Sequence, residues 1–174
     1  YARHAAMGFN YRMAELCAAV LLAQVEKLDV LVHWRVKNGE ALTRALDGCG
    51  WIAPQKIPEG CTHSYWAFAA RLNHPGITWH QFRDRFVAKG GDAFYGAWRI
   101  TYLEPAFQER AFWGIEALND DVKRRFAEAK WQPGHCPNAE LAQSRLMQFK
   151  TNALDEATID AQAQILRDTW RSFQ

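Results

Sequence analysis

Near the start of the chain, apolar side chains recur at steps of three and four residues. They are Met13, Leu16, Cys17, Val20, Leu21, Val25, Leu28 and Val32. This spacing predicts an amphipathic helix that can be followed to about Leu46, where Gly48 and Gly50 end it. Such a helix would have about 33 residues and a length of about 50 Å, so we expect a kink between Val30 and His33. Its length suggests a bridge between domains or subunits.

The rest of the chain alternates between strand and helix patterns. Residues 63–72, HSYWAFAARL, alternate in the manner of a strand with both faces covered. Thr78 and Gln81 form a capping box for a helix that the Gly-Gly pair at 90–91 ends. Residues 92–110 predict a short strand followed by a loop. Further helices are predicted over residues 120–130, from Pro137 to about Phe149, and from Asp155 or Thr158 onwards. This order indicates a small α+β layer of helices on a few-stranded sheet.

The composition is sufficient for one globular domain with a proper core. Of the 174 residues, 49% are apolar and 13% are aromatic, which suits one domain or a large domain with an arm. The net charge is +2, from 21 basic against 19 acidic residues. We therefore do not expect a nucleic-acid surface of the sequence-independent kind, which needs a basic excess.

The cysteines give no signal for a metal site or a disulfide framework. Cys17, Cys49, Cys61 and Cys136 form no CxxC pair and stand at no short Cys/His spacing. No metal is predicted, and free thiols in a reducing cytosol are expected. No apolar run reaches the roughly 18 residues that a membrane span requires, and no signal peptide is recognised. A soluble cytoplasmic protein that binds no membrane is expected.

Two anion-seeking side chains stand just ahead of the first helix, in GFNYRM (residues 8–13). In an extended segment, Asn10 and Arg12 share one face. The amide offers neutral donors to a phosphate oxygen, and the guanidinium offers a planar fork to a carboxylate or phosphate. The helix start adds free backbone N–H groups. Alone the pattern is weak, because an arginine at a helix start is commonly a surface or ion-pair residue.

The stretch GFNYRMAELCAAVLLAQVEKLD (residues 8–29) resembles a signature of the DegT/DnrJ/EryC1/StrS aminotransferases. In that family a Gly-aromatic-Asn-x-Arg-Met/Leu run opens a long helix that ends in a Gln-x-x-Lys-Leu-like stretch, matched here by Gln24, Lys27 and Leu28. HSYWAFAARL and CPNAELAQSRL (136–146) resemble two further family segments. The resemblance covers essentially the whole chain, although only the first block is specific.

The resemblance implies an α/β fold, the type I fold of pyridoxal-phosphate-dependent transferases, similar to aspartate aminotransferase. Residues 1–50 would form the long helix that bridges to an absent large domain, and residues 51–174 the small C-terminal α+β domain. The family implies pyridoxal 5'-phosphate as cofactor and a homodimer with shared active sites. The catalytic lysine would lie outside this chain, because no lysine here (27, 37, 56, 89, 123, 130, 150) lies in a stretch like the family's Schiff-base motif.

Two roles carry over from the family to the start of the chain. Asn10 matches the asparagine that reaches the cofactor phosphate of the partner subunit. Arg12 matches an arginine of the site wall, where it would bind the amino donor's carboxylate or a substrate phosphate. A structural pair of Arg12 with Glu15 or with a carbonyl is the competing interpretation.

Residues 92–107, DAFYGAWRITYLEPAF, align with the family's substrate-facing loop. Trp98 falls near the first of two usual histidines and Tyr102 replaces the second, so a mechanism that uses those imidazoles is in doubt. Tyr95, Trp98 and Tyr102 instead offer flat surfaces on which a sugar or cyclitol could stack. For each of them singly, core packing is the competing interpretation.

His63 and Tyr65 share a face of the predicted strand at 63–72, so both could point toward the same substrate. An ordinary strand-end histidine is the plainer interpretation of His63. The other histidines form no constellation, and none is assigned to the site.

The predicted function is that of the C-terminal part of an aminotransferase. The enzyme would pass an amino group from glutamate or glutamine to a nucleotide-linked keto sugar or a keto cyclitol, by way of an aldimine on the absent lysine. Two alternatives remain open. One is an aminodehydratase of the same family, of the aminohydroxybenzoate-synthase type. The other is a truncated, non-catalytic interaction protein that binds a partner through the long helix.

Overall fold

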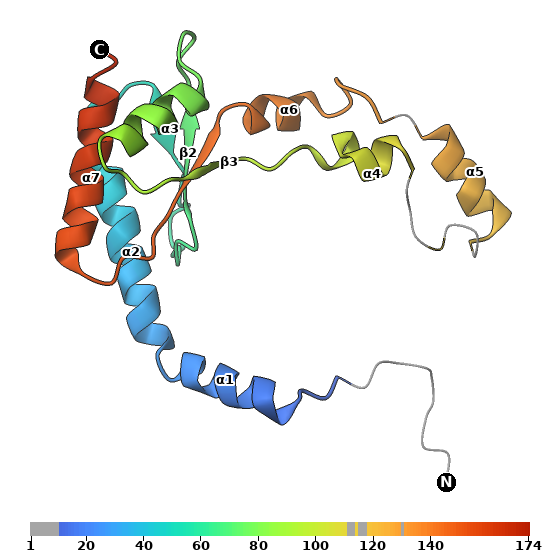
Figure 1. Cartoon of the computed structure of the whole chain (residues 1–174), viewed down its shortest axis with the longest axis horizontal. Coiled ribbons are helices and arrows are strands. Elements are labelled where there is room, and N and C mark those ends of the chain that lie inside the picture. The colour runs from blue at the N-terminus through green and yellow to red at the C-terminus, as the bar shows by residue number, and fades with distance from the viewer. Residues whose placement is uncertain (1–10, 111–113, 115–117, 130) are drawn as a thin grey trace.

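The computed structural model describes residues 11–110, 114, 118–129 and 131–174. In chain order, its elements are α1 (Glu15–Val25), α2 (Leu28–Ala45), β1 (Ile52–Pro54), β2 (Phe68–Leu72), α3 (Trp79–Ala88), β3 (Tyr95–Gly96), the 3-10 helix η1 (Thr101–Leu103), α4 (Pro105–Gln108), α5 (Asp120–Glu128), α6 (Pro137–Gln143), β4 (Leu146–Phe149) and α7 (Glu156–Arg171). The sheet and helices α2, α3 and α7 form one packed unit. Two projections leave that unit: α1, and an arm that carries α4, α5 and α6 (Figure 1).

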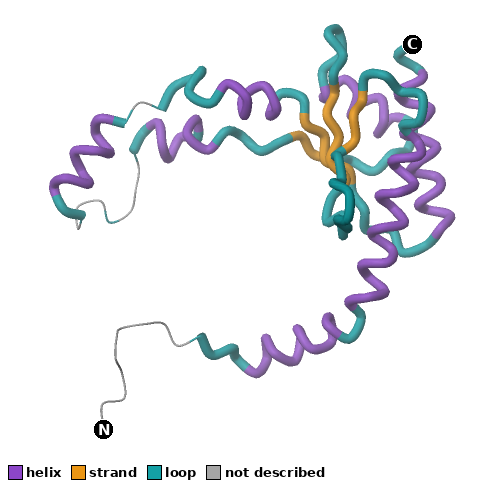
Figure 2. Tube along the Cα trace, turned by 180° about the vertical axis from the view of Figure 1, so that it is seen from behind, coloured by secondary structure: helices purple, strands orange, loops and turns teal. Residues whose placement is uncertain are grey.

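The described residues form a four-stranded antiparallel sheet in the order β1-β2-β4-β3. Across the central pair, Phe68 lies opposite Phe149 and Ala70 opposite Met147. All four side chains are buried, because alternate residues of a strand share one face. Helices α2, α3 and α7 gather beside the sheet (Figure 2) and supply the other half of the core.

An aromatic cluster fills that core. The ring of Phe94 lies 4.3 Å from that of Phe149 and 5.7 Å from that of Phe86. Helix α2 joins α7 through the indole N–H of Trp170, which donates to the carbonyl of Ala45 at 2.8 Å. The C-terminal half of α2 thus belongs to the same core as the sheet, whereas the domain boundary expected at residue 50 stays a prediction.

Two helices stand where one was expected. The chain turns at Glu26 and Lys27, so the predicted kink near Val30 is wrong in position. The expected amphipathic stripe is also wrong for α1, whose sequence ELCAAVLLAQV is apolar on every side and has no buried residue. Leu16, for example, is 78% exposed. A helix that is apolar all round is normally covered by further protein.

Two other predicted elements are corrected. Residues 63–67 form a loop, and only residues 68–72 of the expected strand pair with a neighbour. The helix from Pro137 ends at Gln143, and residues 146–149 form the inner strand β4. Hydrogen bonding on both edges and burial of Met147 and Phe149 favour the strand over the local helical pattern.

The expected short strand and two of the expected helices are confirmed within the described ranges. The short strand inside residues 92–110 is β3, and the helices expected over 120–130 and after Asp155 are α5 and α7. All four cysteines are free thiols, and the described residues contain no cluster of metal-ligating side chains. In the same part of the chain, none of the helices combines the length and the apolar character that crossing a membrane requires.

The capping box at the start of α3 is confirmed. The N–H of Gln81 donates to the hydroxyl of Thr78 at 3.2 Å, and the N–H of Thr78 donates to the side-chain oxygen of Gln81 at 2.9 Å. Replacing Thr78 by alanine is expected to lower the free energy of unfolding by about 1 kcal/mol, because the N–H of Gln81 loses its acceptor. Urea unfolding measures the change, and Thr78→Ser, which keeps the acceptor, should cost clearly less.

Candidate functional site

The residues predicted for the site lie on three separate parts of the chain. Asn10 lies outside the described residues. The others are Arg12 ahead of α1, His63 and Tyr65 in the loop before β2, and Tyr95, Trp98 and Tyr102 in β3 and the segment after it. The start of α1 stays well apart from β3 and the arm (Figure 1). This chain alone therefore does not bring Arg12 to the aromatic residues.

The start of α1 is suited to an anion. Ala14 is the N-cap residue and makes no side-chain cap bond, so among the described residues the backbone N–H groups of the first turn are available there. The side chain of Arg12, two residues earlier, is exposed. A guanidinium beside free amide donors is a donor set that fits a phosphate or a carboxylate.

Tyr65 occupies a tight turn rather than an open strand face. Its backbone is left-handed, with φ 48°, a conformation that a bulky residue adopts only when the surroundings hold it. The N–H of Tyr65 donates to Nδ1 of His63 at 2.8 Å, and its carbonyl accepts the hydroxyl of Thr151. The ring is only 6% exposed and packs against Gly39 of α2. Tyr65 thus contributes to the core and holds the turn, while the exposed ring of His63 lies 4.6 Å from it.

Tyr95 in β3 and Trp98 just after it are both exposed aromatic residues. Their side chains are 67% and 85% exposed. Tyr95 pairs with Gln148 of β4, and the side-chain amide of Gln148 donates to the carbonyl of Gly96 at 2.9 Å. Gly96 also fits closely over Trp79, where a Cβ atom would lie 2.5 Å from the indole. The backbone that presents Tyr95 is therefore fixed by the sheet.

Tyr102 is half-buried and lies in a hydrogen-bonded cluster with α6. Its hydroxyl donates to Oε1 of Glu140 and accepts the N–H of Cys136 at 3.1 Å. The N–H of Gly134 donates to the two oxygens of Glu140 at 2.8 and 2.9 Å. The hydrogen bond from Tyr102, followed by those from the backbone, lowers the pKa of Glu140. Partial burial, and then the bond to Glu140, raises the pKa of Tyr102.

The sequence did not reveal this partner of Tyr102. Glu140 belongs to the CPNAELAQSRL segment, but 38 residues separate it from Tyr102, and no local pattern links the two. Tyr102 was expected to present its hydroxyl to a substrate. In the structure that hydroxyl already donates to Glu140 and accepts from Cys136.

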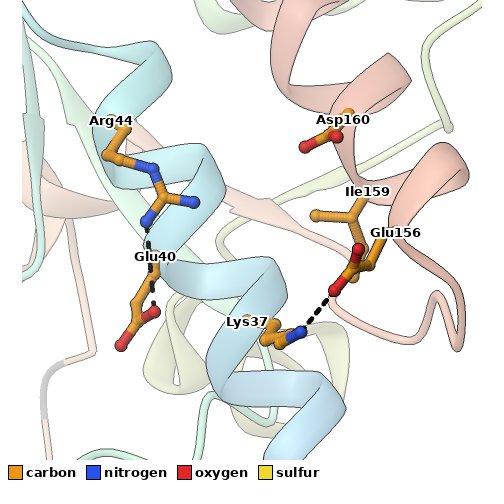
Figure 3. Close-up of a pocket in the computed structure, with 6 residues that line it drawn as sticks. All are labelled: Lys37, Glu40, Arg44, Glu156, Ile159 and Asp160. Atoms are coloured by element: carbon orange, nitrogen blue, oxygen red, sulfur yellow. Dashed lines mark hydrogen bonds and ion pairs between the residues drawn. The ribbon is translucent and has the colours of Figure 1, made fainter.

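A hollow of about 190 Å³ between α2 and α7 lies away from all of these residues. Lys37 bonds to Glu156 across the two helices, and Arg44 stands 4.0 Å from Glu40 (Figure 3). The hydrogen bond and charge of Lys37 lower the pKa of Glu156. These are exposed ion pairs on a helix–helix seam, and such pairs contribute little to stability. We assign this hollow no chemistry.

Comparison with known families matches residues 1–149 to the model of the DegT/DnrJ/EryC1/StrS aminotransferase family. The chain belongs to the DegT/DnrJ/EryC1/StrS aminotransferase family. This match confirms the resemblance stated from the sequence, and the family is one of pyridoxal-phosphate-dependent aminotransferases.

Two curated relatives are named after the compounds they make, 3-amino-5-hydroxybenzoate and GDP-perosamine. The chain is 28% identical over 170 residues to 3-amino-5-hydroxybenzoate synthase of Amycolatopsis mediterranei, covering 95% of this chain and 40% of the relative. It is 26% identical over 137 residues to GDP-perosamine synthase of Vibrio cholerae, covering 76% of this chain and 36% of the relative. The chain thus spans about 40% or less of the length of these DegT/DnrJ/EryC1/StrS relatives.

Solved structures confirm the fold class. The chain superposes on an aminotransferase from Psychrobacter cryohalolentis with a TM-score of 0.72 and 16% identity, over 97% of this chain and 42% of the other. With DesV of S. venezuelae, solved in complex with a ketimine intermediate, the TM-score is 0.70 at 19% identity, over 96% and 39% of the two chains. The α/β type I transferase fold predicted from the sequence is therefore that of these neighbours.

Proposed function

We propose that this chain is the C-terminal part of an aminotransferase that passes an amino group from glutamate or glutamine to a keto sugar or a keto cyclitol. The observation that carries the proposal is the family match over residues 1–149, in a chain that spans about 40% of its relatives. The names of the two curated relatives support an acceptor of sugar or cyclitol type. In this proposal, residues 1–50 bridge to a large domain and residues 51–174 form the small domain.

The exposed apolar surface of α1 supports this division. None of its residues is buried by the described chain, whereas α2 is anchored in the core through Leu42 and Ala45. Covering Leu16, Val20, Leu21 and Leu22 by a further domain or subunit would remove a large apolar area from water. The homodimer with shared sites and the cytoplasmic location remain predictions of the same proposal.

The described residues fit one end of pyridoxal phosphate. The backbone N–H groups at the start of α1 suit the phosphate group, and Asn10 would reach the phosphate bound by the partner subunit. In this proposal, the amine that reacts with the cofactor's carbonyl belongs to a lysine outside this chain. When bound, the cofactor would carry the amino group from donor to ketone and would act as the electron sink for the carbanions formed on the way. This chain's own part is to hold the phosphate, orient the ketone and exclude water from it.

The acceptor would lie against Tyr95 and Trp98, whose flat exposed faces suit the C–H surface of a ring. Arg12 would bind the donor's carboxylate or a substrate phosphate. His63 lies two residues before Tyr65 with an exposed ring, and in this proposal it contacts the substrate. For Tyr65 the contact with substrate would be limited because the residue is buried. For Tyr102 it would be limited to the ring edge, because its hydroxyl is bonded to Glu140 and Cys136.

The test of the proposal uses the full-length protein that carries this chain. Purified with pyridoxal phosphate, it should show the visible absorbance of bound cofactor, and L-glutamate or L-glutamine should bleach that absorbance. A panel of nucleotide-linked keto sugars and keto cyclitols should then restore it. A full-length protein that binds no cofactor would overturn the proposal and favour the interaction protein.

Replacing Trp98 by alanine is expected to raise the KM for the ketone about two- to tenfold, because one aromatic contact is lost. The donor half-reaction should change by less than twofold. Trp66→Ala is the matched control, since Trp66 is also exposed, at 79%, but lies in the loop before β2. Equal effects of the two substitutions on KM would contradict the proposed acceptor surface.

A second candidate is supported by the match to 3-amino-5-hydroxybenzoate synthase over 95% of the chain. In this alternative the same cofactor chemistry ends in loss of water rather than in transfer of the amino group. Product analysis after incubation with a hydroxylated keto cyclitol separates the two: an amine supports the transaminase, and a dehydrated, aromatic product supports the aminodehydratase.

A further inference from the structure

Within the arm, residues 101–110 lie beside residues 131–143 (Figure 1). Besides the Tyr102 cluster, hydrogen bonds from two side chains and a ring contact between Phe107 and Trp131 connect the described residues on the two sides of the arm. The amide of Gln108 donates to the carbonyls of Tyr102 and Trp131 at 2.6 and 2.7 Å. Arg110 donates to the carbonyl of Ala129 at 3.2 Å. The Tyr102 cluster is the tie nearest to the sheet.

Glu140 is the central acceptor of that cluster. One carboxylate receives the hydroxyl of Tyr102 from the first stretch and the N–H of Gly134 from the second. The bond from Cys136 to the Tyr102 hydroxyl closes the connection. Hydrogen bonds to an ionised carboxylate are stronger than those between neutral groups. Loss of the Glu140 charge would therefore weaken both halves of the connection at once.

The segment between β3 and Tyr102 is fixed at both of its ends. At one end, Gln148 holds the carbonyl of Gly96 and Trp79 packs over its backbone. At the other end, Glu140 holds Tyr102. Trp98 lies between these two points with its ring 85% exposed. The position of an exposed ring on a short segment depends on where the ends of that segment are held.

We propose that Glu140 is a positioning residue that holds the segment 97–101 through Tyr102 and so sets the affinity for the ketone at Trp98. This inference rests on the proposed function for its link to the ketone. In this proposal Glu140 does not contact the ketone and acts only through its hydrogen bond with the hydroxyl of Tyr102. In the competing structural role, Glu140 would only stabilise the turn at Gly134 ahead of α6.

Hydrogen exchange on the full-length protein tests the holding role without any activity. Glu140→Gln and Tyr102→Phe should each speed exchange about two- to tenfold in peptides from both segments, 97–104 and 133–141. Glu128→Gln is the matched control, because it removes only an exposed pair with Arg124 within α5. Faster exchange confined to 133–141 in Glu140→Gln would show the local role instead and overturn the proposal.

Kinetics test the link to the ketone, using whichever ketone of the panel the wild-type protein aminates. In Glu140→Gln the KM for that ketone should rise about two- to tenfold, with kcat and the L-glutamate half-reaction within twofold of wild type. Adding Tyr102→Phe to Glu140→Gln should produce no further rise, because the two residues act through one contact. Additive effects, or equal losses in both half-reactions, would overturn the proposal.

The two levels of failure are distinguishable. If no ketone is aminated and no cofactor is bound, the proposed function fails and the link to the ketone fails with it. The exchange data still decide whether Glu140 holds residues 97–101. If ketones are aminated but KM is unchanged in both variants, the proposed function stands and the positioning role is overturned.

Discussion

Replacing Phe94 by alanine should lower the free energy of unfolding by about 3–5 kcal/mol, the usual cost of emptying an aromatic site in a packed core. Phe94 is 1% exposed, and its ring contacts those of Phe82, Phe86 and Phe149, the last at 4.3 Å. These neighbours come from α3 and β4, so no single element can move in to fill the cavity.

The measurement is urea denaturation of the full-length protein, followed by far-UV circular dichroism. Trp98→Ala serves as the control, because that ring is exposed and its loss should change the free energy of unfolding by less than about 0.5 kcal/mol. Phe94 also directly precedes β3, so the variant should raise the KM for the ketone as well. A cost below about 1.5 kcal/mol for Phe94→Ala would show that the cluster repacks easily.

Replacing Gly39 by alanine should destabilise the protein by about 1–3 kcal/mol, although alanine is the better helix former. A Cβ atom at Gly39 would lie 2.5 Å from the ring of Tyr65. That ring is buried, and its backbone is held in a left-handed turn by His63 and Thr151. The ring therefore cannot yield without breaking the turn.

Thermal unfolding of two further variants checks this cause. Gly50→Ala is the matched control, since no atom lies within 4 Å of its added Cβ, and it should leave stability unchanged or slightly higher. In a Tyr65→Ala background, Gly39→Ala should no longer be harmful and should stabilise by up to about 1 kcal/mol. A stabilising effect of Gly39→Ala in the wild-type chain would contradict the argument.

Elements that depend on local signals were predictable from the sequence. The capping box of α3 involves residues three apart, and Asp155 caps α7 by accepting the N–H of Thr158 at 2.8 Å. Such contacts form within one helical turn, so the sequence specifies them directly. The signature at residues 8–29 likewise identified the family before any fold was known.

Elements that depend on distant contacts were not predictable. Strand β4 forms where LMQF lies between β2 and β3, and no neighbour in the sequence indicates that pairing. The turn at Tyr65 depends on Thr151, 86 residues away. The Tyr102–Glu140 contact is of the same kind. In each case tertiary contacts outweigh the local pattern.

The candidate site was predictable only in part. The sequence selected Tyr95 and Trp98, and the structure exposes both, Tyr95 in the edge strand β3 and Trp98 two residues after that strand. Their role with a substrate stays a prediction, as do the roles of Arg12 and of Asn10, which lies outside the described residues. The site draws on a large domain and a second subunit in our proposal, and neither can be derived from the chemistry of this segment.

Both edge strands of the sheet, β1 and β3, expose few backbone groups with which a strand of another chain could pair. On one side β1 has three residues and ends at Pro54, which lacks an N–H group, and on the other side β3 has two residues. Short borders that carry proline resist edge-to-edge aggregation. The described sheet therefore offers no long edge to a partner's strand, whereas the exposed apolar side chains of α1 offer a surface that another polypeptide could cover.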